Sequence, residues 1–118
     1  MLIENKIDDA TMLSIAFDGE GKDANVEYLM SIAVGDTEDY IESVHITKDL
    51  TLTKDNVVKI LRAVNDMNVE SIGVIYSIDF EDKSLTASMY ANGTHSVDEL
   101  YDMIADTMDA AVENFQKV

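Results

Sequence analysis

Carboxylate side chains recur at helical spacing near the carboxyl end of the chain. Asp98, Asp102, Asp106, Asp109 and Glu113 are three or four residues apart, and at about 100° per residue they fall within about 80° of one helix surface. Such steps put neighbouring carboxylates roughly 5 to 6 Å apart along a helix axis, close to the spacing of phosphates along one nucleic-acid strand. This segment therefore has the chemistry of an anionic ladder that suits a basic groove.

Two features distinguish this ladder from an ordinary polar helix face. No Lys or Arg lies between Lys83 and Lys117, so the acids have no i,i+4 partner and their like charges mildly destabilise the helix. Asp is also a poorer helix former than Glu or Lys. The alternative is a solvated face, which every amphipathic helix has and which is acidic by default in an acidic protein.

Two predicted hairpin turns carry the other acidic groups: Asp79, Glu81 and Asp82 in one, and Asp36, Glu38 and Asp39 in the other. We include the first group with the ladder as a candidate for partner binding. The alternative is a structural role, because Asp side chains in turns accept hydrogen bonds from nearby backbone amides.

No set of residues predicts catalysis or metal binding. The chain has no cysteine, and its two histidines, His45 and His95, show no metal-ligand spacing. No serine lies in a G-x-S-x-G elbow, and there is neither a P-loop nor a dinucleotide fingerprint. We therefore expect no enzymatic activity, no metal and no cofactor, and an undetected site around one of the histidines is the alternative.

The net charge limits the kind of partner. Twenty-four acidic residues against eight basic ones give a net charge of −16, and a basic partner or high salt offsets the resulting repulsion. Direct binding to nucleic acid or to an anionic membrane is disfavoured because Arg62 is the only arginine. Residues 1–17 contain Glu4, Asp8 and Asp9 and lack a signal-peptide pattern, and no apolar run reaches about 20 residues, so we predict a cytoplasmic protein.

The elements that position these groups follow from the hydrophobic pattern. Strands are predicted at residues 11–17, 26–34, 40–47, about 70–79 and 84–91. Turns are predicted at the polar stretch 18–25 and at residues 80–83. Residues 1–10 fit a short edge strand, a helical turn or a swapped arm.

Two segments change to the helical period. The first is capped by Thr53, has Asp55 in its first turn and has apolar residues at helical spacing from Val57 to Met67. The second runs from a Ser96 cap to about residue 116, with Glu99 completing an S-x-x-E capping box. Its apolar side is predicted to contain Val97, Leu100, Tyr101, Ile104, Met108, Ala111, Val112 and Phe115.

The element order βββαββα predicts a single α+β domain over residues 1–118, with an antiparallel sheet of about five strands and two helices on one face. Residues 25–66 and 68–109 also align without a gap, with ten identities over 42 positions, which suggests an internal ββα duplication. The other sheet face then lacks a cover. Because apolar residues occupy both strand parities (Leu29 and Ala33; Met30, Ile32 and Val34), we expect a homodimer through the sheet.

These features predict a non-catalytic acidic binding protein. We expect an inhibitor that occupies a basic, nucleic-acid-binding surface of a partner protein by charge mimicry. In composition, the small, acidic and cysteine-free chain resembles phage-encoded inhibitors that imitate nucleic acid, although no motif ties it to a named family. The alternative is a self-associating structural or assembly module whose acidity serves solubility.

Overall fold

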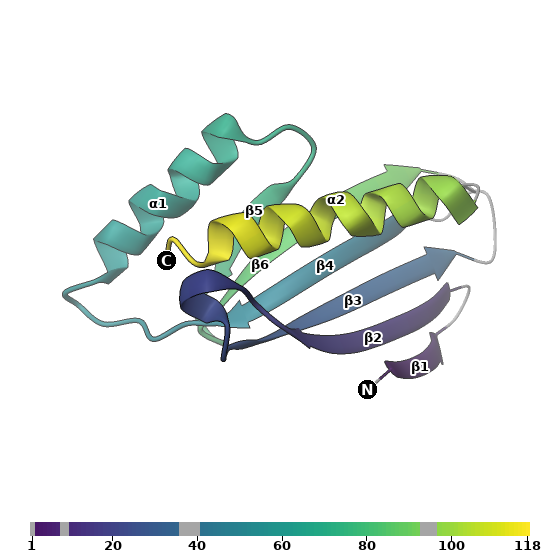
Figure 1. Ribbon diagram of the computed structural model, residues 1–118, viewed down its shortest axis with the longest axis horizontal. Helices are drawn as coiled ribbons and strands as arrows, with labels where there is room; N and C mark the ends of the chain where they lie inside the picture. Colours follow the sequence, from purple (N-terminus) through teal and green to yellow (C-terminus); the bar gives the residue numbers. More distant parts are fainter. Residues whose placement is uncertain (1, 8–9, 36–40, 93–96) are drawn as a thin grey trace.

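A six-stranded antiparallel sheet forms one layer of the protein (Figure 1). The computed structural model describes residues 2–7, 10–35, 41–92 and 97–118, and the side chains of residues 11–34, 42–91 and 98–118. The strands are β1 (Leu2–Ile7), β2 (Ala10–Asp18), β3 (Glu27–Gly35), β4 (Ile41–Asp49), β5 (Ile75–Asp79) and β6 (Ser84–Asn92). They lie in the order β1-β2-β3-β4-β6-β5, and every neighbouring pair is antiparallel.

The predicted α+β class and the antiparallel sheet with two helices on one face are confirmed. The sheet has one strand more than the five expected, because residues 2–7 pair with β2 in the register Leu2↔Ile15 to Ile7↔Ala10. Of the three alternatives for residues 1–10, the edge strand is therefore the one found.

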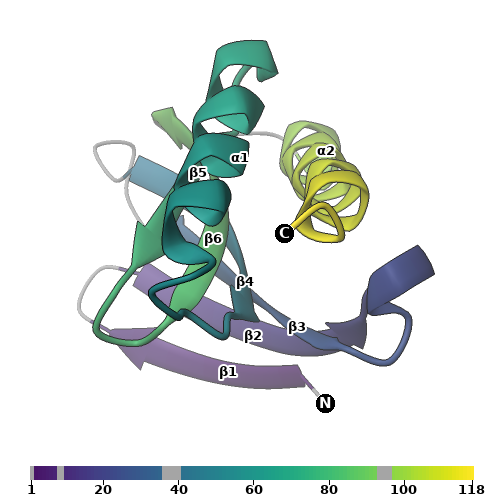
Figure 2. The ribbon, with the colours of Figure 1, turned by 90° about the vertical axis from the view of Figure 1, so that its left-hand side faces the viewer.

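Two helices cover the same side of the sheet. Helix α2 (Val97–Phe115) lies across the middle of the sheet, which bends around it, and α1 (Val57–Glu70) lies beside the edge formed by β5 (Figures 1 and 2). The short 3-10 helix η1 (Gly21–Asp23) lies in the β2–β3 connection. Six buried helix residues contribute to the core, namely Ile60, Val64, Met67, Met103, Ala111 and Phe115.

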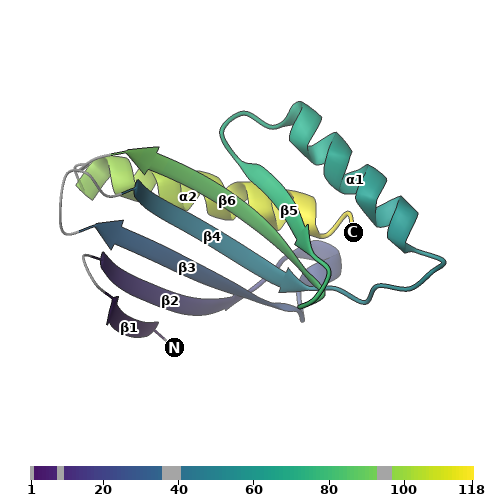
Figure 3. The ribbon, with the colours of Figure 1, turned by 180° about the vertical axis from the view of Figure 1, so that it is seen from behind.

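The strand register sorts the side chains between the two sheet faces. One row across the sheet joins Ile15, Met30, Ile46, Ala87 and Tyr76, and these residues belong to the core or pack against it. Since side chains alternate along a strand, the residues between them point away from the helices. The latter residues form the second face of the sheet, which Figure 3 shows from behind with no helix in front of it.

Helix α1 begins and ends later than the sequence predicts. Thr53 and Asn56 cap each other reciprocally, since Thr53 Oγ1 accepts the Asn56 N–H at 3.2 Å and Asn56 Oδ1 accepts the Thr53 N–H at 2.7 Å. The prediction that Thr53 caps the helix is wrong, because the regular helix starts at Val57 with Asn56 at its N-cap position, so Thr53 and Asp55 both precede it. The predicted Ser96 cap of α2 lies outside the described residues.

The strand predicted from about residue 70 begins only at Ile75, because α1 continues to Glu70 and a turn follows it. Ser71 Oγ donates a hydrogen bond to the Val74 carbonyl at 2.6 Å. Gly73 has a φ of +86°, which glycine adopts without the steric penalty of a side chain. These two residues close the chain into a turn where the sequence suggested extended backbone.

A buried ion pair holds the end of α2 against the sheet. Lys48 Nζ, on β4, lies 2.7 Å from Asp23 Oδ2 and donates hydrogen bonds to the carbonyls of Phe115 at 2.8 Å and Val118 at 3.2 Å. The Tyr28 hydroxyl donates to the same Asp23 oxygen at 2.5 Å. Burial acts to raise the pKa of Asp23, but the hydrogen bonds from Lys48 and Tyr28 and the nearby lysine charges outweigh it, so the pKa is lowered.

The two ββα segments of the chain are placed symmetrically in the sheet. The order β3-β4-β6-β5 is symmetric about the border between β4 and β6, two strands that begin 43 residues apart and have equal length. At that border His45 pairs with Ser88, its counterpart at the same offset. This arrangement suits two ββα halves, and the duplication stays a prediction.

Candidate protein-binding site on helix α2

The outer side of α2 carries the five predicted carboxylates. All of them are exposed, and we call them the acidic ridge: Asp98, Asp102, Asp106, Asp109 and Glu113. At a rise of about 1.5 Å per residue, the ridge extends over about 22 Å of helix. This length corresponds to several successive phosphates of a nucleic-acid strand.

The opposite side of α2 is packed against the sheet. Its buried residues recur every fourth position, at Met103, Thr107, Ala111 and Phe115. The predicted contacts of Leu100, Ile104, Met108 and Val112 with the core are also confirmed. Thr107 was not expected there, and its buried hydroxyl is satisfied by the Met103 carbonyl at 2.6 Å.

Tyr101 was predicted to lie on the apolar side of the helix, but 68% of this side chain is exposed. At about 100° per residue, Tyr101 lies about a quarter of a turn from the centre of the buried stripe, at the border between the sheet-facing side and the ridge. Val97, predicted for the same apolar side, has a side chain outside the described residues.

Among the described residues, the last four members of the ridge form no ion pair. In the described part of the chain, no Lys or Arg nitrogen lies within 4 Å of a carboxylate oxygen of Asp102, Asp106, Asp109 or Glu113. These charges therefore face solvent and one another, and like charges at i,i+4 spacing destabilise a helix. A basic surface that docked on the ridge would remove this repulsion.

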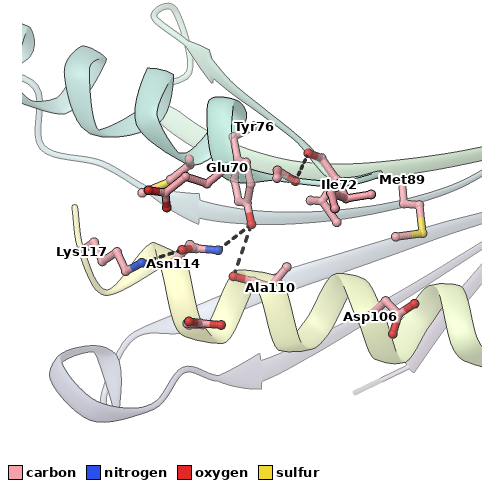
Figure 4. A pocket seen from close by; sticks show the side chains of 12 residues that line it. Glu70, Ile72, Tyr76, Met89, Asp106, Ala110, Asn114 and Lys117 are labelled. Carbon is pink, nitrogen blue, oxygen red and sulfur yellow. Dashed lines mark hydrogen bonds between the residues drawn. The ribbon is translucent and has the colours of Figure 1, made fainter.

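A groove of about 350 Å³ separates the ridge from the end of α1 (Figure 4). Glu70 of α1 lies on one bank, and Asp106 and Glu113 of the ridge lie on the other. Tyr76 crosses between the layers, where its hydroxyl accepts a hydrogen bond from Asn114 Nδ2 at 2.8 Å. The remaining lining includes the apolar residues Met67, Ile72, Val74, Met89 and Ala110, together with Ser71 and the basic residue Lys117.

A second groove, of about 440 Å³, lies on the other flank of the ridge. Asp109 and Glu113 border it from α2, and Glu20 borders it from the β2–β3 connection, with Met108 and Val112 as apolar lining. Glu20 and Glu70 thus add carboxylates to the two flanks, and neither was predicted. Periodicity within one segment does not reveal them, because they reach the ridge only through the packing of other elements.

Lysines mark the carboxyl end of the ridge. A groove of about 190 Å³ there is lined by Lys22, Lys59 and Lys117, together with Asn56, Ile60, Ala63 and Val118. Positive charge at this end complements the negative end of the α2 dipole. The charge along α2 therefore changes sign within one turn after Glu113.

The acidic turn between β5 and β6 is separate from the ridge. Asp79 Oδ1 accepts the backbone N–H groups of Glu81 and Asp82, each at 3.0 Å, as expected for the structural alternative. None of Asp79, Glu81 and Asp82 lines a groove beside α2. The equivalent residues Asp36, Glu38 and Asp39 lie outside the described residues.

His45 has a local role in the sheet. Its Nδ1 lies 2.7 Å from Ser88 Oγ, and its ring packs edge-on against Tyr90 with centroids 5.4 Å apart. Burial lowers its pKa, which favours the neutral ring. Among the described side chains no group of three or more His, Asp or Glu residues is arranged to hold a metal ion, and His95 lies outside them.

In the residues described, neither α1 nor α2 has the length and apolarity to cross a bilayer. No protein-family model matches the chain, no curated protein matches its sequence, and no solved structure matches its fold.

Proposed function

We propose that this chain is a non-catalytic binding protein that presents the acidic ridge to a basic surface of a partner protein. The observation that carries the proposal is the ridge itself, an exposed row of carboxylates along α2 whose central members form no ion pair with a described Lys or Arg. The partner surface that fits best is one that otherwise holds a phosphate backbone, because such a surface is lined with Lys and Arg that bind a row of negative charges. The protein would then act as an inhibitor by charge mimicry.

The two flanking grooves support this proposal because they suit long basic side chains. An Arg or Lys has an aliphatic stem as well as a charged head, and the stem gains from apolar contact. In the groove beside α1, Met67 and Met89 offer that contact, while Glu70 and Asp106 offer carboxylates for the head. The ridge with its grooves therefore suits a basic protein better than a simple cation.

Capture of partners from a lysate of the organism that encodes the chain tests this proposal. At about 50 mM salt we expect the protein to retain a nucleic-acid-handling protein, and at about 500 mM salt to release it, since screening shortens the range of exposed charges. Added duplex DNA should compete for the same partner. Asp102→Lys combined with Asp106→Lys should reduce the affinity at least about tenfold, because two attractive contacts become repulsive.

A matched control separates the ridge from the net charge. Asp55→Lys combined with Asp66→Lys changes the net charge equally at two exposed positions near or on α1, and it should change the affinity by less than about twofold. Equal loss in both double variants would mean that only total charge matters. Capture that survives high salt, DNA and the ridge variant would contradict mimicry by α2.

A further inference from the structure

The sheet face opposite the helices is organised in three rows of side chains, which we call the outer face. The first row joins Ala16, Leu29, Thr47, Thr86 and Ser77. The second joins Ser14, Ser31, His45, Ser88 and Ile75. The third joins Met12, Ala33, Ser43 and Tyr90. No described helix lies over this face (Figure 3).

The outer face carries no Asp, Glu, Lys or Arg. Charged residues make up 27% of the chain, and the solvent side of an antiparallel sheet ordinarily holds its share of them. Here the charges stop at one end of the face, where Asp18 pairs with Glu27, and Asp49 and Asp79 both pair with Ser84. The face is thus an uncharged block with an acidic border at one end.

Four polar side chains of the outer face are paired with one another. His45 bonds Ser88 at 2.7 Å, and the hydroxyls of Thr47 and Thr86 lie 3.1 Å apart. Groups that already have a hydrogen-bond partner lose less when water is removed. The face can therefore be covered by another surface without leaving these groups unsatisfied.

Three large apolar side chains of this face are exposed, and a fourth, Met12, is partly buried. Leu29 is 48% exposed, Ile75 is 56% exposed and Tyr90 is 54% exposed. They occupy different strands and different rows, with serine, alanine and threonine between them. Exposed apolar groups that lie together on one surface are typical of a site that another protein surface covers.

We propose that the outer face is a homodimer interface, in which the outer faces of two copies pack against each other. The distribution of charge indicates that the surface covering this face belongs to a second copy of the chain. Two molecules of charge −16 repel wherever their carboxylates meet, and the outer face lets them approach with none in contact. A basic partner would instead find its complement on the acidic ridge.

The area is compatible with a reversible dimer. Each residue on a sheet face occupies about 32 Å², from a strand spacing of about 4.8 Å and a two-residue repeat of about 6.7 Å. The three rows then offer about 450 Å² per protomer, or roughly 900 Å² for the pair. This estimate treats the face as a plane and leaves out the additional surface of protruding side chains. Specific interfaces begin near roughly 1,000 Å², so we expect a dissociation constant in the micromolar range.

The acidic border also fixes the orientation. A two-fold axis parallel to the strands would bring the two acidic borders together, whereas an axis across the strands sends them to opposite ends of the dimer. Repulsion between the borders therefore favours the second arrangement, in which the row containing Leu29 meets the partner's row containing Tyr90.

Sedimentation equilibrium of the full chain, with a concentration series at low and high salt, tests the interface. The wild-type dimer should tighten as salt rises, because screening weakens repulsion between like-charged protomers. Leu29→Lys and Tyr90→Lys, each checked for an unchanged circular dichroism spectrum, should weaken the dimer at least about tenfold. Lysine lowers the net negative charge, so this loss cannot arise from added long-range repulsion.

Leu61→Lys is the matched control, since Leu61 is 42% exposed on α1, away from the sheet, and it should leave dimerisation unchanged. A wild-type chain that stays monomeric at about 1 mM and high salt would overturn the proposal, as would a dimer that both outer-face variants leave intact. The expected salt dependence has the opposite sign to that of partner capture by the ridge. Failure of one proposal is therefore distinguishable from failure of the other.

Discussion

At the scale of single residues, Lys48 makes contacts with residues far away in the sequence, which local sequence patterns do not predict. The acidic ridge was predictable because its members lie within one segment and repeat at helical spacing. The contacts of Lys48 reach 25 residues back to Asp23 and 67 residues forward to Phe115. No periodicity within β4 indicates them, and the same holds for Glu20 and Glu70 beside the ridge.

Replacing Lys48 should therefore be severe. Lys48→Met leaves the Asp23 carboxylate buried without its cation and removes two hydrogen bonds to the end of α2. We expect the free energy of unfolding to fall by about 3 to 5 kcal/mol, as measured by urea denaturation. Lys59→Met, at an exposed lysine of α1, should change it by no more than about 0.5 kcal/mol, and equal effects would refute the structural role of the pair.

At the scale of elements, the hydrophobic pattern predicted the position of α2 well but predicted the border between α1 and β5 poorly. Helix α2 was located well because its apolar and acidic residues separate onto opposite sides. β5 was predicted to begin at about residue 70, although α1 continues to Glu70 and a turn precedes the strand, which begins at Ile75. Packing of Ile60, Val64 and Met67 extends that helix, and a local propensity does not report such packing.

The composition of α2 implies that the ridge lowers stability. Asp106→Lys would place a cation one turn after Asp102, in the favourable acid-to-base order, and would replace a poor helix former. We expect the free energy of unfolding to rise by about 0.5 to 1 kcal/mol, as measured by thermal and urea denaturation. Asp66→Lys on α1 offers a comparison, because the new lysine would follow Arg62 by four residues and should give no gain. A ridge variant that is less stable than wild type would contradict this account.

At the scale of the whole molecule, the main feature is that both helices lie on one side of the sheet and leave the other side uncovered. The uncovered face was predictable from the element order, whereas its uncharged rows were not, because they form only when five strands pair in one register. Two copies joined through that face would present their acidic ridges in opposite directions. One dimer would then bind two basic partners without steric conflict between them.

Spin labels at Asp49→Cys test this arrangement in the cysteine-free chain. Asp49 is exposed and lies four residues along β4 from His45, which sits in the middle row of the outer face. With the two-fold axis across the strands at that row, the two labelled positions lie roughly 27 Å apart along the strand direction. With the axis parallel to the strands they would face each other across roughly 10 Å, so a short distance in double electron–electron resonance would exclude the proposed orientation.

The lysine groove at the end of α2 gives the ridge a direction. Lys22, Lys59 and Lys117 lie just beyond Glu113, so a basic surface that continued past that point would meet charges of its own sign. A partner whose positive track is longer than the ridge can overhang only at the amino-terminal end of α2. The three lysines would thus repel a basic partner that extended beyond the carboxyl end of the ridge. The partner would therefore bind in one direction along α2, even if every carboxylate of the ridge were equivalent.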